Sequence, residues 1–160
     1  MHQIVVDIGE YRVTDDPSAI LIAYSLGSCI AVALYDPVVK VGGMLHLMLP
    51  DSEIHPLRAK ERPGMFADTG IPLILESCEM LGAKKSRLQV KVAGGGEMLD
   101  SSSFFKIGKR NFVAVRRILW QHGLMIRAQD VGGNANRTVS LEMATGKVKV
   151  KISGDGVKEL

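Results

Sequence analysis

The chain has 160 residues, a length that suits one domain over residues 1–160 with a core that needs neither disulfide nor metal. Twenty basic and seventeen acidic residues, well mixed along the chain, leave a net charge of +3, and aromatic residues make up only 5%. This composition argues against a nucleic-acid-binding protein, which would show clustered basic charge or aromatic side chains for base stacking.

The first third of the sequence predicts short strands that carry few charges. Strand-like segments cover residues 3–8 and 19–24, and the turn signal Asp-Asp-Pro-Ser at 15–18 separates them. Two further segments, CIAVALY at 29–35 and GMLHLML at 43–49, flank a turn-rich linker. They predict a β-hairpin.

The rest of the chain mixes a loop, helices and strands. The polar stretch 50–64 contains three prolines and predicts an exposed loop. Apolar residues at i, i+3, i+4 and i+7 predict a helix over 67–81 that ends at Gly82, and a similar stripe predicts a helix from about Asn111 to Gly123. With the strands, these helices predict an α+β fold, a layered sandwich of mostly antiparallel strands with flanking helices. The strands expected in this half cover 87–92, 124–131, 138–143 and 147–152, the last two as a hairpin.

The most apolar stretch of the chain runs without a charge from Pro17 to Tyr35. A membrane-spanning helix needs about 20 uninterrupted apolar residues, whereas a Gly-Ser pair breaks this stretch near its centre. Two buried strands joined by a turn fit better, so we expect no membrane insertion. Because the N-terminal segment lacks the basic and long apolar regions of a signal peptide, we expect a cytoplasmic protein with reduced thiols at Cys29 and Cys78.

Cys29 lies directly after the Gly27-Ser28 turn. In such a turn, successive backbone N–H groups lie outside any strand ladder and are free to bind a developing oxyanion. A thiol beside them becomes a nucleophile toward a carbonyl carbon when a base or a positive group lies close by. The turn residues are therefore candidate oxyanion contacts, and Cys29 is a candidate nucleophile.

His46 is the candidate base. If the hairpin turns between Val38 and Val39, the numbers of paired residues sum to 77 and Ala31 lies opposite His46. Cys29 and His46 then share one face as diagonal neighbours, about 7–8 Å apart at Cα. A one-residue slip in register would place them on opposite faces, so the prediction depends on the register.

The residue types alone favour a simpler interpretation, because a cysteine among apolar neighbours is more often a core residue than half of a Cys-His dyad. Cys78 lies on the stripe of a predicted helix and is expected in the core. His122 precedes a helix-ending glycine, where a cation is favoured. The triglycine 94–96 lacks the Lys-Ser/Thr signature of a phosphate loop and predicts a tight turn or a close backbone approach. Two cysteines without metal-ligand spacing predict no metal site.

Four segments carry a more specific pattern, namely SLGSCIAVALYDP at 25–37, VGGMLHLMLP at 41–50, FKIGKRN at 105–111 and DVGGNANR at 130–137. Together they resemble the CheD family, the chemoreceptor glutamine deamidases of bacterial and archaeal chemotaxis. Their order and spacing match the family from about Ile8 to Lys149. The resemblance implies a layered α/β sandwich similar to the catalytic domain of deamidating bacterial toxins. It also implies conversion of selected glutamines on receptor signalling helices to glutamate, without metal or organic cofactor.

The resemblance also implies site residues and partners. The nucleophilic cysteine of the family matches Cys29, and its base histidine matches His46. The F-x-I-G-x-R-N element, near partner and substrate contacts in the family, matches Phe105 to Asn111 here. Family members bind CheC, a phosphatase of phosphorylated CheY, and the same chemistry would hydrolyse a receptor glutamyl methyl ester. A function of another class stays open, in which the protein mainly regulates a CheC-type phosphatase by binding and has weak or no catalysis.

One position departs from the family pattern. The family commonly carries a threonine six residues before the cysteine, as the third polar member of the site, and this chain has Ala23 there. Ser25 lies two residues further on and would point the same way on a regular strand. We therefore expect Ser25, or a backbone carbonyl, to orient His46.

Overall fold

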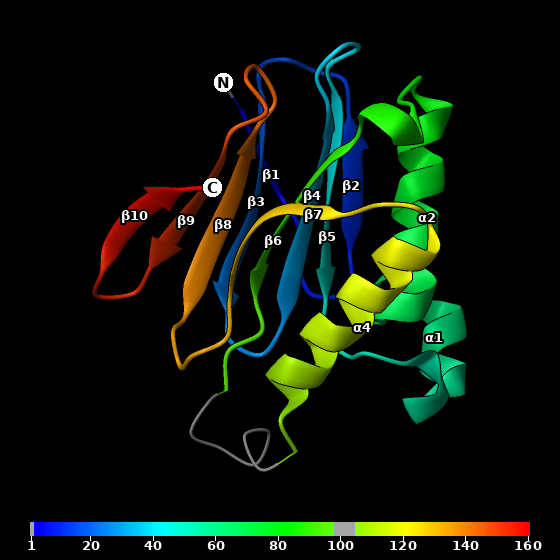
Figure 1. The fold of residues 1–160 in the computed structure, drawn as a ribbon, viewed down its shortest axis with the longest axis vertical. Helices are drawn as coiled ribbons and strands as arrows, with labels where there is room; N and C mark the ends of the chain where they lie inside the picture. Colours follow the sequence, from blue (N-terminus) through cyan, green and yellow to red (C-terminus); the bar gives the residue numbers. More distant parts are fainter. Residues whose placement is uncertain (1, 98–104) are drawn as a thin grey trace.

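The computed structural model describes residues 2–97 and 105–160 and contains two five-stranded sheets packed face to face (Figure 1). The first sheet has the order β1-β3-β8-β9-β10 and the second the order β2-β5-β4-β6-β7. Most strand pairs are antiparallel, and the pairs β1–β3 and β6–β7 are parallel. The strands are β1 His2–Val5, β2 Tyr11–Thr14, β3 Ala19–Leu26, β4 Ile30–Asp36, β5 Val41–Leu47, β6 Gln89–Gly94, β7 Ile126–Val131, β8 Arg137–Glu142, β9 Val148–Ile152 and β10 Gly156–Glu159.

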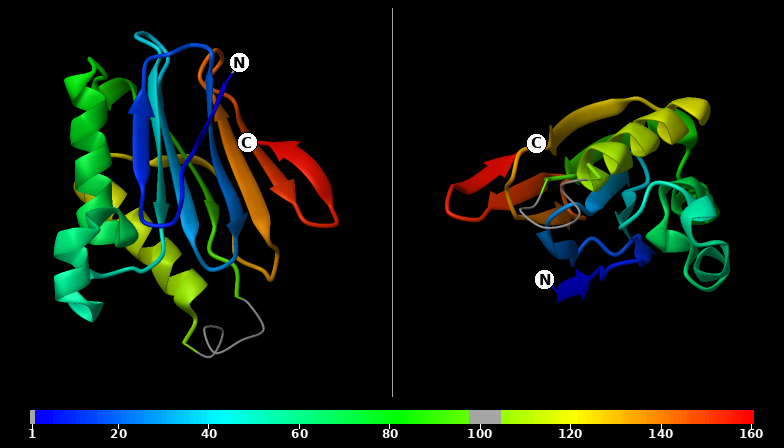
Figure 2. Two further views of the ribbon diagram at one scale, coloured as in Figure 1. Left: turned by 180° about the vertical axis from the view of Figure 1, so that it is seen from behind. Right: turned by 90° about the horizontal axis from the view of Figure 1, so that it is seen from below.

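Two long helices, α2 (Ala67–Met80) and α4 (Ile107–Gln121), cover the outer side of the second sheet. Figure 2 shows both helices on that side, with the first sheet at the opposite side of the molecule. The predicted α+β sandwich with mostly antiparallel strands and flanking helices is confirmed. No helix in the described ranges is long and apolar enough to cross a membrane.

Strand β4 separates two apolar cores, because its side chains alternate between its two faces. Its larger aliphatic residues pack toward the helices, and two alanines and a tyrosine pack toward the first sheet. The helix-side residues are Ile30, Val32 and Leu34. The sheet-side residues are Ala31, Ala33 and Tyr35.

The β4–β5 hairpin has the register that the sequence predicts. Ala31 pairs with His46, and Ile30 pairs with Leu47 at the open end. The apolar stretch 17–35 also forms two buried strands, β3 and β4, but the two belong to different sheets. The segment between them therefore carries the chain from one sheet to the other.

Several elements differ from the sequence-based expectation. The stretch 50–64 is not a plain loop but holds the short helix α1 (Pro56–Glu61) between two 3-10 turns, and the His55 side chain caps α1 by accepting from the Arg58 N–H. Helix α4 starts at Ile107, four residues earlier than expected. Strands β2 and β10 were not predicted, because each has four residues with charges among them and β10 is fully exposed.

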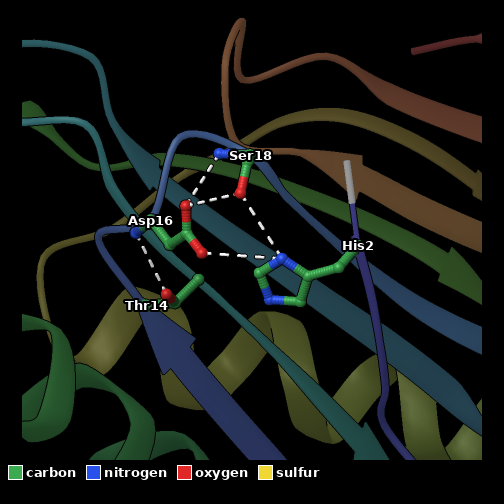
Figure 3. A network of polar contacts seen from close by, with 4 residues as sticks. All are labelled: His2, Thr14, Asp16 and Ser18. Carbon is green, nitrogen blue, oxygen red and sulfur yellow. Dashed lines mark hydrogen bonds and ion pairs between the residues drawn. The ribbon is translucent and has the colours of Figure 1, made fainter.

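A polar network fixes the start of β1 to the turn before β3 (Figure 3). The Asp16 carboxylate accepts from the Ser18 N–H at 2.9 Å and from its hydroxyl at 2.8 Å, and the His2 ring lies 3.6 Å away. The Asp16 N–H donates to the Thr14 hydroxyl. The hydrogen bond from the Ser18 N–H is the largest of the contributions that lower the pKa of Asp16. The turn signal at 15–18 is thus a self-bonded turn that positions β3.

Asp36, at the end of β4, is a fully buried carboxylate. It accepts from Arg87 Nε and Nη2, at 3.0 and 2.9 Å, and from the backbone N–H groups of Lys84 and Val38. Burial raises the pKa of Asp36, but these hydrogen bonds outweigh burial and bring the pKa down to about 2. The pair anchors the loop after α2 to the sheet.

Removal of the Arg87 guanidinium by Arg87→Met should lower the free energy of unfolding at pH 7 by about 2 kcal/mol, because a buried carboxylate loses charged donors. Lys84→Met is the matched control, since Lys84 contacts Asp36 through its backbone and its exposed side chain adds little. The folded pKa lies below the unfolded value of about 4, so wild-type stability should fall as the pH drops from about 4 through about 2. Urea titrations of the variants at pH 7 and of wild type from pH 7 to 2 check the two statements. Equal losses in the two variants would contradict the first, and a wild-type stability that does not fall below about pH 4 would contradict the second.

Candidate active site

Cys29 lies on the crossing from the first sheet to the second. β3 ends at Leu26 and β4 begins at Ile30, so residues 27–29 form the whole connection. Cys29 is half-buried and packs against the core between the sheets. The Gly-Ser-Cys break in the apolar stretch is therefore the point where the chain changes sheets.

All three carbonyl groups of this connection are hydrogen-bonded. The Gly95 and Gly96 N–H groups donate to the carbonyls of Cys29 and Gly27, both at 2.8 Å. The Ser28 carbonyl accepts from the Asn111 side chain at 2.9 Å. No N–H of residues 27–29 donates to another residue within the described ranges. Since C=O and N–H point to opposite sides of a trans peptide unit, the bonded carbonyls turn the unpaired N–H groups the other way.

The triglycine 94–96 allows this close contact. Gly94 has φ of +117°, and a Cβ atom there would collide with the Cys29 carbonyl. The Arg137 guanidinium, which is buried, donates to the Gly94 and Gly132 carbonyls and forms an ion pair with Asp130. The predicted close backbone approach is confirmed, and the DVGGNANR segment holds it in place.

His46 is 3% exposed and lies one residue before the open end of the hairpin, opposite Ala31. Met44, two residues before His46, packs in the core between the sheets. Because side chains two residues apart on a strand face the same side, His46 faces that gap too. The ring Nδ1 lies 3.0 Å from the Val6 carbonyl oxygen. Because a carbonyl only accepts, Nδ1 carries the hydrogen and Nε2 presents its lone pair. Nε2 is buried and has no hydrogen-bond partner among the described residues.

Cys29 and His46 therefore face the same side of the second sheet. Cys29 lies one residue beyond the Ile30–Leu47 pair and packs against the core between the sheets. Because Ala31 pairs with His46, Cys29 is the diagonal neighbour of His46, a relation that corresponds to about 7–8 Å between Cα atoms. The register on which the prediction depended is thus present.

Both groups are electrically neutral at rest. Burial raises the pKa of the Cys29 thiol to about 11, against a smaller opposing contribution from its own backbone N–H. Burial also lowers the pKa of His46, against the Val6 carbonyl and the carboxylates of Asp7 and Glu10, which raise it. At neutral pH the pair is therefore a thiol and an unprotonated imidazole, and not a thiolate-imidazolium ion pair.

Ser25 does not take the orientation expected from strand alternation. The β3–β8 register shifts between Ala23 and Leu26, and Ser25 has a left-handed φ of +57°. Ala23 is fully buried between the sheets, whereas Ser25 is exposed and its N–H donates to the Thr138 hydroxyl. The bulge thus turns Ser25 away from the Ala23 side. The observed contact of His46 Nδ1 is the second alternative, a backbone carbonyl.

The remaining expected residues lie at the start of α4. Phe105 is 59% exposed and lines a cavity of about 480 Å³ together with Lys109, Arg110 and Pro50. Asn111, the last residue of the F-x-I-G-x-R-N element, was not predicted as a site residue, yet it is fully buried and donates to the Ser28 carbonyl next to Cys29. Its signal was a polar residue on the apolar stripe of the predicted helix. The role of Cys78 as a core residue fits its complete burial on the inner face of α2.

A methyl group at Gly94 should disrupt the crossing between the sheets. Gly82→Ala is the matched control, because Gly82 has a similar φ of +101° but open space around its Cβ position. Both variants share the backbone strain, and Gly94→Ala adds a clash with the Cys29 carbonyl worth about 1–3 kcal/mol. Urea unfolding measures the difference. Equal losses in the two variants would show that the contact between Gly94 and Cys29 is not tight.

Comparisons with known proteins show the family of this chain. A family model described as CheD chemotactic sensory transduction matches residues 48–152. A probable chemoreceptor glutamine deamidase CheD of Syntrophus aciditrophicus is 52% identical over the full length of both chains. A probable deamidase of the same name from Solibacter usitatus is 47% identical over 96% of this chain and 91% of its own, and the chemoreceptor glutamine deamidase CheD of Thermotoga maritima is 42% identical over 95% and 93%. The chain belongs to the CheD family.

Proposed function

We propose that this protein is a chemoreceptor glutamine deamidase that uses Cys29 as nucleophile and His46 as general base. The observation that carries the proposal is the state of His46, whose Nδ1 is tied to a carbonyl while its buried Nε2 has no partner in the described part of the chain. A buried imidazole nitrogen without a partner costs stability, so its retention on the sheet face that Cys29 shares favours a functional role. The names of full-length relatives support the substrate class.

In the proposed reaction, Cys29 Sγ attacks the carboxamide carbon of a glutamine side chain while its proton passes to His46 Nε2. The N–H groups of Ser28 and Cys29, which donate to no other described residue, stabilise the oxyanion. His46 returns the proton to the leaving nitrogen, and ammonia departs as the thioester forms. Water then attacks the thioester, with His46 as base. The products are glutamate and the regenerated thiol.

The resting protonation states fit this sequence of steps. With a thiol pKa of about 11, Cys29 is not a thiolate at neutral pH, so its proton must leave during the attack. An unprotonated His46 beside it is ready to accept that proton. The Val6 carbonyl fixes the ring and favours the imidazolium that forms. The backbone thus supplies the orientation that the family threonine would otherwise give.

Two finer features belong to the same proposal. The thioester route would also hydrolyse a receptor glutamyl methyl ester, because an alkoxide leaves more readily than an amide nitrogen. We also propose a cytoplasmic location beside receptor signalling helices and a CheC-type phosphatase as partner. A protein that acts only as a binding regulator would have no need for the arrangement of Cys29 and His46.

The direct test is mass spectrometry of a receptor cytoplasmic fragment after incubation with the protein. Wild type should add the mass of a Gln-to-Glu change, and Cys29→Ala should not, since the variant has no nucleophile. Cys78→Ala is the matched control and should keep the activity, because Cys78 is buried in the other core. Wild-type protein that is folded and leaves every cognate fragment unchanged would overturn the deamidase assignment.

The pH profile gives a second test. Because the pKa of His46 lies below its ordinary value of about 6.5, kcat/KM should decline on the acid side only below pH 6.5. The rate should stay level through pH 8, where a thiolate-imidazolium pair would instead lose its imidazolium. An acid limb that lies above pH 6.5 would contradict the role of a neutral, buried His46.

A further inference from the structure

Asn111 joins the two halves of the candidate site. Its side chain is fully buried at the start of α4. The Nδ2 amide donates to the Ser28 carbonyl at 2.9 Å and to the Met48 carbonyl at 3.0 Å. Ser28 immediately precedes Cys29, and Met48 lies two residues after His46. One amide group therefore links the segment that carries Cys29 to the residue that follows strand β5, which carries His46.

The contact to Ser28 controls a particular peptide unit. Its carbonyl is held by Asn111, so the N–H of the same unit, that of Cys29, points away from α4. The flanking carbonyls of Gly27 and Cys29 are held by backbone N–H groups of the triglycine. The middle unit is thus the one that depends on a side chain.

Attachment of α4 to the sheet does not explain this amide. Buried apolar side chains along the same helix, such as Val115 and Leu119, already pack against the second sheet. A buried amide is costly unless it is bonded, and Asn111 Oδ1 has no partner among the described residues. Only the two N–H donors of the side chain are in use, and both go to the two ends of the candidate site.

We propose that Asn111 is a positioning residue that sets the Ser28–Cys29 peptide unit and so aims the Cys29 N–H at the oxyanion. The inference rests on the proposed function, because it concerns the oxyanion of the same reaction. It predicts a selective defect. Reactions of Cys29 that pass through a tetrahedral oxyanion should slow, whereas reactions that need only the sulfur should not.

Two small reagents separate these cases without a receptor. With p-nitrophenyl acetate, Cys29 Sγ attacks the ester carbonyl, its proton passes to His46, p-nitrophenolate leaves and an acetyl thioester forms through an oxyanion. With iodoacetamide, the sulfur displaces iodide at a saturated carbon and forms no oxyanion. Both reactions are measured on protein with Cys78 replaced by alanine, in which Cys29 is the remaining thiol, and the rate of the Cys29→Ala form is subtracted as background from other nucleophiles.

Asn111→Leu, which keeps the approximate shape and removes both donors, should slow acylation by about 10- to 100-fold and change alkylation by less than about threefold. Ile118→Val on the same buried face of α4 is the matched control and should leave the ratio of the two rates unchanged. If Asn111→Leu does not fold, the ratio is measured on Asn111→Ser, which keeps a donor hydroxyl and should show a smaller selective loss.

Three results would overturn the proposal, namely an unchanged ratio in the folded Asn111 variant, an equal selective loss in Ile118→Val, or a wild type that is alkylated but not acylated. Failure of the proposed function has a different signature. In that case wild-type Cys29 is acylated with the expected Asn111 dependence, but no receptor fragment changes mass.

Discussion

The site depends on one constraint, the fixed path of three residues where the chain passes from one sheet to the other. All three carbonyls of residues 27–29 accept hydrogen bonds. The donors are the N–H groups of Gly95 and Gly96, which follow β6, and the side-chain amide of Asn111 on α4. That binding fixes the peptide planes, leaves the N–H groups unpaired within the described residues and places the thiol at the head of β4. The buried Arg137 donates to the carbonyls of Gly94 and Gly132 and so fixes the glycine segment that contacts this connection. Residues of β6, α4 and β8 thus all contribute to fixing this one short connection.

Burial raises the pKa of the Cys29 thiol and lowers the pKa of the His46 ring, and both shifts favour the uncharged form. It keeps the Cys29 proton on sulfur and keeps the His46 ring unprotonated, so that the pair carries no charge in the gap between the sheets. Charged partners in such a place would need desolvation that only further hydrogen bonds offset. A neutral pair also leaves the thiol poorly reactive toward unrelated electrophiles, because the thiolate is the nucleophilic form. Under the proposed function, reaction at a carbonyl that also contacts the N–H groups would be favoured over reaction with an electrophile that does not.

The sequence predicted those features that depend on local periodicity, and it missed those that depend on contacts between distant segments. The turn at Val38 and Val39 set the hairpin register, because strand alternation and turn position together leave few alternatives. The orientation of Ser25 was wrong, because a bulge against β8 breaks the alternation that the inference used. The Val6 carbonyl has no sequence signature at all, since every residue carries one. Asn111 could be noticed as the last residue of the F-x-I-G-x-R-N element and as a polar residue on a helix stripe, but its hydrogen-bond partners follow only from the fold.

The contact between His46 and Val6 has a consequence for how the family pattern can vary. A main-chain oxygen survives any side-chain substitution at its own position, provided that the local path of the chain is kept. The orienting group here is therefore protected against point mutation in a way that a hydroxyl side chain is not. Position 23 then needs no polar side chain for this contact, and Ala23 is fully buried in the core between the sheets. Under the proposed function, an alanine where the family commonly has threonine is compatible with an oriented His46, because the orienting atom belongs to the main chain.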